Sequence, residues 1–261
     1  MDLDLTGKHA LVCGASEGIG RAAARELALL GADVTLLARR ADVLETLADE
    51  LPRSDGQQHA WISADVLDTD RLRAQAQALA AGKPVHILVN NTGGPPGGPV
   101  NAAESDAFER AFRQHLLANQ ALAQAVLPGM RAARFGRIVN VISTSVKEPI
   151  AGLGVSNTIR GAVASWAKTL ATEVGGDGIT VNNVLPGYTR TQRLDQILGD
   201  RAKATGQPED AIAKGMLATV PAGRFADASE LGAVIAFLCS PAAGYINGVN
   251  LPVDGGRTKS L

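Results

Sequence analysis

The sequence is poor in aromatic residues, in cysteine and in net charge, and each shortage excludes a class of protein. Its 261 residues include five Phe, two Tyr and two Trp, and the formal net charge is −1. Such a charge gives no electrostatic attraction to nucleic acid or to an anionic membrane surface. The two cysteines, Cys13 and Cys239, have neither C-x-x-C nor metal-ligand spacing. We therefore expect buried thiols in a reducing compartment and no metal site.

Long hydrophobic runs are also missing. No apolar run approaches the roughly 18 residues of a membrane span. Residues 1–8 show none of the basic, apolar and cleavage regions of a signal peptide. We therefore expect a cytoplasmic protein that neither crosses nor binds membranes. With 46% hydrophobic and 20% charged residues, the chain has the composition of a folded globular protein.

Short apolar runs alternate with longer amphipathic runs along the whole chain. This alternation predicts βαβ units, and right-handed crossovers then give a doubly wound parallel sheet with helices on both faces. The expected fold is an α/β Rossmann fold of about seven strands, formed by one domain over residues 1–261. The expected strands are 8–13, 33–38, 58–63, 85–90, 136–142, 179–184 and 248–252. The expected helices are 18–30, 41–51, 68–81, 103–133 (broken into two), 155–174 and 228–239.

Two further segments bear on function. Residues 93–99 are rich in glycine and proline and directly follow the strand that ends at Asn90. Ligands bind outside the carboxyl ends of parallel strands, so this segment is interpreted as a site loop. Residues 192–222 have scattered charges and weak periodicity, which predicts a mobile insertion that serves as a substrate lid.

A glycine turn lies between the first expected strand and the first expected helix. Residues 14–20 have the spacing G-x-x-x-G-x-G. Such a turn lets the backbone approach a pyrophosphate, while the helix N-terminus offers free N–H groups and a positive dipole end. The turn therefore predicts a dinucleotide site, and a purely structural turn is the alternative. The expected cofactor contacts here are Gly14, Ser16, Gly18, Ile19 and Gly20.

The end of the second strand bears on the choice between NADP and NAD. An acidic residue there binds the ribose 2′-hydroxyl, whereas arginine accommodates a 2′-phosphate. Arg39 and Arg40 stand at this point, with no acid before Asp42. The pattern favours NADP, although Glu17 in the glycine turn would crowd a 2′-phosphate and keeps NAD open. Asp65, after the third strand, is placed to accept a hydrogen bond from the adenine amino group.

At this point the chain resembles the short-chain dehydrogenase/reductases, in particular the bacterial 3-oxoacyl-acyl-carrier-protein reductase-like group. The resemblance covers nearly the whole chain. It implies that Asn90 and Gly93 form the adenine-ribose floor and that Thr191 contacts the nicotinamide carboxamide. It also implies a homotetramer built from the helices at 103–133 and 155–174 and from the C-terminal strand. The matching segments are Gly14-x-x-x-Gly18-Ile19-Gly20, Asp65-Val66, Leu88-Val89-Asn90-Asn91-Thr92-Gly93, residues 136–143, Val181-Asn182, Pro186-Gly187 with Thr191, and residues 253–256.

The resemblance fails at the residues that carry out the family's chemistry. The family's reaction is hydride transfer between nicotinamide and a carbonyl or alcohol carbon. A serine polarises the carbonyl, a tyrosine 13 residues later handles the proton, a lysine four residues beyond it binds ribose, and an asparagine orders a water. Ser143 keeps its role. Ser156 replaces the tyrosine, Arg160 replaces the lysine, and His115 stands where the asparagine is expected.

These replacements leave the proton donor open. Arginine cannot donate a proton but can bind ribose hydroxyls, and serine is a weak acid without an activating base. Histidine titrates near neutrality, so His115 is a candidate proton carrier, with a structural histidine as the alternative. Tyr188 could swing toward the substrate but is more typical of a packing residue, and Lys147 is a solvated lysine by default.

Three functions therefore stay open. The leading one is an NADP-dependent oxidoreductase acting on a small or acyl-thioester carbonyl. The second is a non-enzymatic NADP-binding sensor or subunit. The third is a lyase or isomerase that uses Ser143 and His115 without hydride transfer.

Overall fold

The computed structural model describes residues 1–54 and 56–260 and shows a parallel sheet in the order β3-β2-β1-β4-β5-β6-β9. All six neighbouring pairs run parallel. This confirms the predicted doubly wound sheet of seven strands. The strands are β1 (His9–Cys13), β2 (Asp33–Ala38), β3 (Ala60–Ser63), β4 (Ile87–Asn90), β5 (Gly136–Val141), β6 (Ile179–Pro186) and β9 (Asn250–Val253).

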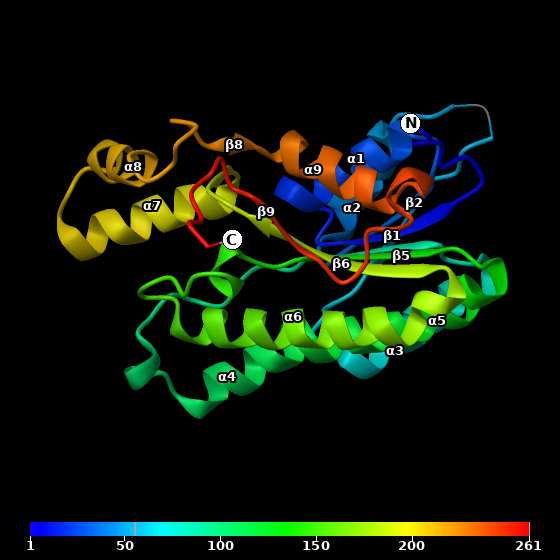
Figure 1. Ribbon diagram of the computed structural model, residues 1–261, viewed down its shortest axis with the longest axis horizontal. Helices are drawn as coiled ribbons and strands as arrows, with labels where there is room; N and C mark the ends of the chain where they lie inside the picture. The colour runs from blue at the N-terminus through cyan, green and yellow to red at the C-terminus, as the bar shows by residue number, and fades with distance from the viewer. Residues whose placement is uncertain (55, 261) are drawn as a thin grey trace.

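Helices cover both faces of the sheet (Figure 1). One layer holds α1 (Gly18–Leu29), α2 (Ala41–Glu50) and α9 (Ala228–Cys239). The opposite layer holds α3 (Thr69–Gly82), α4 (Ser105–Phe112), α5 (Ala118–Ala133) and α6 (Gly154–Val174). Two separate apolar clusters result, because each strand presents alternate side chains to opposite faces. Val12 belongs to the first cluster and Leu11 to the second.

A ladder of asparagine side chains crosses four strands within this sheet. Asn90 donates from Nδ2 to Asn140, Asn140 donates to Asn183, and Asn183 donates to Asn250, each at 2.8 Å. The four residues are register partners on β4, β5, β6 and β9. Buried amides need such partners, so the ladder fixes the register of these four strands.

Two helices form in the segment that was expected to be a mobile insertion. Helix α7 (Gln192–Thr205) and helix α8 (Glu209–Leu217) pack against each other through a small apolar cluster. A two-stranded sheet of β7 (Thr189–Arg190) and β8 (Ala226–Asp227) joins the two ends of the segment. In Figure 1 the pair projects beyond the main sheet.

The expected break in 103–133 is a π-helical turn over Arg113–Leu117, between α4 and α5. None of the helices in residues 1–54 and 56–260 is long and apolar enough to cross a membrane. Among the same residues no group of three or more His, Cys, Asp or Glu side chains could hold a metal ion.

Candidate functional site

A cavity of about 870 Å³ opens at the carboxyl edge of the sheet. Its walls come from the glycine turn, the segments that follow β2, β3, β4 and β5, and the helices α6 and α7. This is the position where doubly wound sheets bind ligands. The cavity joins most of the predicted cofactor residues and most of the predicted catalytic residues in one space.

The glycine turn is packed too closely for any side chain at two of its glycines. Gly14 has φ +60°, and a Cβ atom there would lie 2.5 Å from the carbonyl oxygen of Asn91. A Cβ on Gly20 would overlap the carbonyl oxygen of Gly14. The turn is therefore held tightly against the segment after β4, and its backbone N–H groups at the start of α1 stay free to meet an anion.

The two arginines after β2 have different surroundings, although both line the cavity. Arg40 donates to the carboxylate of Glu17 at 2.6 Å and to the hydroxyl of Ser16 at 3.2 Å. Glu17 therefore neutralises Arg40. For the side chain of Arg39 the described residues show no carboxylate within 4.0 Å. Arg39 is thus the better placed of the two to meet a 2′-phosphate.

Ser143, Ser156 and Arg160 line the same cavity. The Oγ atom of Ser143 accepts a hydrogen bond from the backbone N–H of Ser145 at 3.0 Å, which leaves its O–H free to donate. Arg160 is 7% exposed and donates to the carbonyl oxygens of Val141, at 3.1 Å, and Thr92, at 3.5 Å. Burial, reinforced by the positive charge of Arg193, lowers the pKa of Arg160 to about 10. Arg160 therefore stays cationic at neutral pH.

His115 lies behind the cavity rather than in its wall. It is 2% exposed, and its Nδ1 atom is 2.6 Å from the hydroxyl of Thr92. Burial lowers the pKa of His115 to about 2, with a further contribution from the charge of Arg160. The imidazole is consequently neutral at pH 7. The expectation that it titrates near pH 6–7 does not fit this environment, because a buried cation beside another cation is strongly disfavoured.

Tyr188 also lines the cavity, between two contacts that hold its ring. Its ring packs edge-on against Phe225, with centroids 6.2 Å apart, and the guanidinium of Arg257 lies 4.7 Å from the Tyr188 ring centroid. These contacts agree with the packing role that was expected for it. Lys147 is not among the described residues that line the cavity.

Most of the residues predicted from the sequence meet at this cavity. Besides the three catalytic candidates, those that line it are Gly14, Ser16, Gly18, Ile19, Arg39, Arg40, Asp65, Val66, Gly93, Pro186, Gly187 and Thr191. Among the described lining residues Gly20, Asn90 and His115 are missing. Gly20 packs beneath the glycine turn, and the Asn90 side chain is committed to the asparagine ladder.

Several lining residues were not singled out as site residues from the sequence. They are Asn91, Thr92, Gly94, Pro95, Arg110, Gln114, Leu153 and Arg193. Asn91 and Thr92 stand in the motif that ends at Gly93, Gly94 and Pro95 belong to the segment interpreted as a site loop, and Arg193 belongs to the expected lid. Arg110, Gln114 and Leu153 reach the cavity through contacts between distant segments.

The lining residues fit a dinucleotide with a 2′-phosphate. The close-packed glycine turn forms the cradle that a pyrophosphate requires, and Thr191 lies above it, with Cγ2 3.1 Å from where a Cβ of Gly18 would stand. Arg39 supplies a cation at the end of β2. Asp65, after β3, lines the same cavity.

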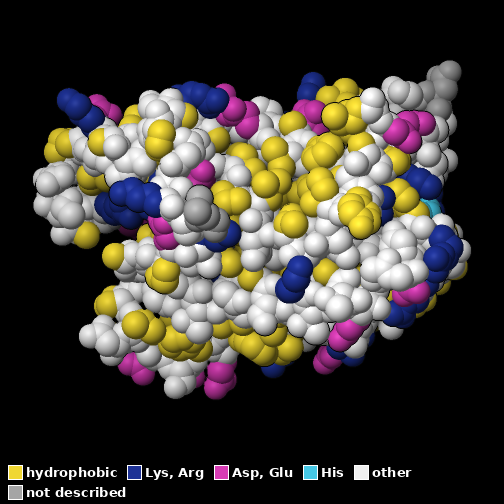
Figure 2. Space-filling view, in the orientation of Figure 1, with side chains coloured by type: hydrophobic (Ala, Val, Ile, Leu, Met, Phe, Trp, Pro, Cys, Tyr) yellow, Lys and Arg dark blue, Asp and Glu magenta, His cyan; other side chains and the backbone are white. Residues whose placement is uncertain are grey.

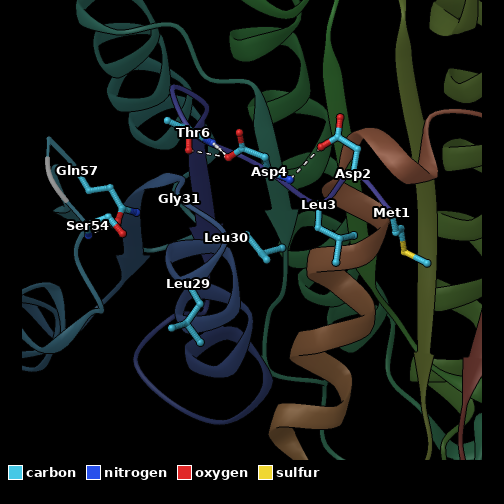
Figure 3. A pocket seen from close by; sticks show the side chains of 10 residues that line it. All are labelled: Met1, Asp2, Leu3, Asp4, Thr6, Leu29, Leu30, Gly31, Ser54 and Gln57. Carbon is cyan, nitrogen blue, oxygen red and sulfur yellow. Dashed lines mark hydrogen bonds between the residues drawn. The ribbon is translucent and has the colours of Figure 1, made fainter.

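A second cavity, near the N-terminus, lacks these features (Figure 3). It lies by the C-terminal end of α1 and is lined by Asp2, Asp4 and Thr6 among others. The carboxylate of Asp4 accepts hydrogen bonds from the backbone N–H and hydroxyl of Thr6. Its ten described lining residues include no Lys or Arg, so the cavity is unsuited to a phosphate.

The family model described as "Enoyl-(Acyl carrier protein) reductase" matches residues 14–258. The chain is 34% identical to 3-oxoacyl-[acyl-carrier-protein] reductase FabG of Pseudomonas aeruginosa, over 99% of this chain and 100% of that protein. It is 34% identical to the cyclohexanol dehydrogenase of a Rhodococcus species, over 99% of each chain.

Solved structures agree with these sequence matches. The L-sorbose reductase of Gluconobacter frateurii, complexed with NADPH and L-sorbose, superposes with a TM-score of 0.93 at 31% identity over 100% of both chains. A gluconate 5-dehydrogenase of Burkholderia cenocepacia, in complex with NADP and tartrate, gives a TM-score of 0.88 at 31% identity over 100% of this chain and 98% of that chain.

Proposed function

The chain belongs to the short-chain dehydrogenase/reductase family, and from this premise we propose that it is an NADP-dependent oxidoreductase. It reduces a small or acyl-linked carbonyl compound with an atypical proton-donating site. The observation that carries the proposal is that a single cavity joins Arg39 and the glycine turn to Ser143, Ser156 and Arg160. Two NADP(H)-complexed structures of the same fold support the choice of cofactor.

The glycine turn, Arg39 and Thr191 would hold the cofactor, which supplies a hydride to the carbonyl carbon when bound. The chain's own residues act on the carbonyl oxygen. Ser143 has a free O–H to donate, and Ser156 lies in the same wall. Arg160 adds a permanent positive charge to the same cavity, and such a charge favours an anionic group nearby.

The proton for the alkoxide comes from the half-buried Ser156 hydroxyl and is restored from water. His115 does not supply it, because the neutral imidazole lies behind Thr92. A serine is a poor acid without a base. We therefore expect slow turnover, below that of a site with a positioned general acid by about 10²- to 10⁴-fold.

A second candidate is a non-enzymatic NADP-binding protein. It is favoured by one observation: neither His115, with a pKa of about 2, nor Arg160, with a pKa of about 10, exchanges a proton near pH 7. Such a protein would retain the cofactor side of the cavity and use binding alone.

The experiment measures NADPH oxidation over ketones and 3-oxoacyl thioesters for the wild type and for Ser156→Tyr with Arg160→Lys. The double variant restores the family's acid and its basic neighbour. A faster reduction in the double variant supports a site still shaped for hydride transfer. Tight NADPH binding without turnover in either protein favours the second candidate. Loss of substrate without cofactor oxidation would contradict both.

We also propose a homotetramer, a cytoplasmic location and a lid role for α7 and α8. Figure 2 shows hydrophobic side chains gathered over α9 and β9. Tyr245, between α9 and β9 in the sequence, is fully exposed, and Phe112 and Leu117, near α4 and α5, are 39% and 37% exposed. Two buried free cysteines fit the reducing compartment that a cytoplasmic location provides.

The lid role of α7 and α8 is supported by the position of α7, because residues of this helix already line the cavity.

A further inference from the structure

Charge is divided unevenly within the main cavity. The described acidic residues that line it are Glu17 in the glycine turn and Asp65 after β3. Both belong to the half built on β1, β2 and β3. The half beside Ser143 and Ser156 is instead lined by three arginines, Arg110 from α4, Arg160 from α6 and Arg193 from α7.

These three arginines lack an anionic partner. Within residues 1–54 and 56–260 no carboxylate lies within 4.0 Å of any of them. Arg160 is the arginine most in need of an anionic partner. Only 7% of its surface is exposed, and its Nε–H has no hydrogen-bond partner. A buried cation without a counter-charge is costly, so its retention in a cavity wall points to a ligand that completes it.

Arg160 and Arg193 converge on one point. A Cβ atom on Gly94 would lie 3.8 Å from Nη2 of Arg160 and 3.9 Å from Nη2 of Arg193. The backbone of the segment after β4 holds both, since Arg160 donates to Thr92 and Arg193 donates to the carbonyl of Pro95 at 3.1 Å. Their mutual repulsion appears in the pKa of Arg160, which burial and then Arg193 lower.

We infer that Arg193 and Arg160 bind a carboxylate on the substrate, so that the carbonyl compound is an oxo acid rather than a neutral ketone. The two oxygens of a carboxylate can each accept an N–H at about 2.8 Å and bridge two guanidiniums. The anion also removes the repulsion between the two cations. The anion site itself does not depend on the proposed function. Only the assignment of the bound carboxylate to the substrate that is reduced rests on that function.

Distance separates this site from the cofactor arginines. Arg39 follows β2, whereas Arg160 contacts the end of β5, and β1 and β4 lie between those strands. Three steps of about 4.8 Å between neighbouring strands separate the carboxyl ends of β2 and β5 by roughly 14 Å. The backbone positions therefore favour two separate anion sites.

The test measures anion binding by calorimetry, with tartrate as the charged probe and threitol as its neutral counterpart. Titrations use the full chain with and without NADP⁺. We expect tartrate to bind and threitol to bind at least tenfold more weakly. Arg193→Gln should weaken tartrate by roughly ten- to a hundredfold, as expected for a charge-assisted hydrogen bond, and should leave threitol and NADPH affinity unchanged. Arg190→Gln is the matched control, because Arg190 lies three residues earlier and pairs with Asp227 outside the cavity.

A second pair of variants places the anion on the chain itself. Gly94→Asp puts a carboxylate between the two guanidiniums, while Gly94→Asn adds nearly the same volume without charge. The aspartate variant should have the higher thermal midpoint at low salt and should no longer bind tartrate. Equal midpoints for the two variants would overturn the inference.

The remaining outcomes separate this inference from the proposed function. Equal tartrate affinity in the wild type and Arg193→Gln would overturn it. A loss of NADPH affinity in Arg193→Gln as large as the loss of tartrate affinity would also overturn it, because the arginine would then bind the cofactor. If no carbonyl compound is reduced but tartrate is still preferred through Arg193, the anion site stands and the reductase assignment fails.

Discussion

The buried histidine makes the stability of the protein depend on pH in a way that can be calculated. His115 has a usual pKa of 6.5, and burial in the folded protein lowers it to about 2. A lowered folded pKa means that stability is complete above pH 6.5 and falls as the pH drops below that value. Each pH unit between 6.5 and the folded pKa corresponds to about 1.36 kcal/mol. At pH 5.0, 1.5 units below 6.5, His115 should cost the folded state about 2 kcal/mol.

The variant His115→Asn isolates this contribution. Asparagine cannot titrate, and the family places one at this position. Urea unfolding at pH 7.5 and pH 5.0, at fixed protein concentration and ionic strength, gives the loss of unfolding free energy for each protein. We expect the loss to be about 2 kcal/mol smaller in His115→Asn than in the wild type. Any packing cost of the substitution cancels, because each protein is compared with itself.

Thr92→Val is the matched control. It removes the hydroxyl that lies 2.6 Å from Nδ1 but keeps the imidazole. It should lower stability at both pH values and retain the wild-type difference between them. If His115→Asn shows the same pH dependence as the wild type, the imidazole titrates normally in the folded protein. The argument that His115 is buried and neutral, and so cannot supply the proton, would then be wrong. His115 would again be a candidate proton carrier.

Three further predictions concern the sheet, the cofactor and the assembly. Asn140→Leu leaves Nδ2 of Asn90 without its acceptor and Oδ1 of Asn183 without its donor, so we expect a loss of roughly 2–5 kcal/mol in urea unfolding, and a loss under about 1 kcal/mol would contradict the ladder. Arg39→Ala should weaken NADPH by roughly ten- to a hundredfold in titrations without changing NADH, and an equal loss for both would remove Arg39 from the 2′-phosphate site. Light scattering at micromolar concentration should give the mass of a tetramer, and a monomer would exclude the proposed assembly.

The regular part of the fold could be predicted because each element contains its own periodic signal. The expected bounds 33–38 and 228–239 coincide with β2 and α9. The helices α7 and α8 were not predicted in the segment 192–222, because its apolar signal is short. Leu194 and Leu198, and likewise Ile212 and Met216, are spaced four apart, but two residues per helix are too few to stand out among charges.

The site was predictable where it depends on motifs and not where it depends on packing. The spacing from Ser143 to Ser156 and Arg160 grouped these three residues, and all three line one cavity. Nothing local indicated that His115 would be buried, because the π-helical turn that positions it depends on the contacts of α4 and α5. The approach of Arg193 to Gly94 likewise joins segments about a hundred residues apart.

The replacement of lysine by arginine at position 160 follows from the charge of its surroundings. A lysine there would be buried and would face Arg193, and both effects lower the pKa of an ammonium group. It could lose its proton near neutrality and with it the positive charge of the cavity. Arg160, by contrast, keeps a pKa of about 10 under the same two influences. Arginine thus preserves a permanent cation beside the second cation, Arg193. It follows that Arg160→Lys restores the family's arrangement fully only when the charge of Arg193 is also removed or is neutralised by a bound carboxylate.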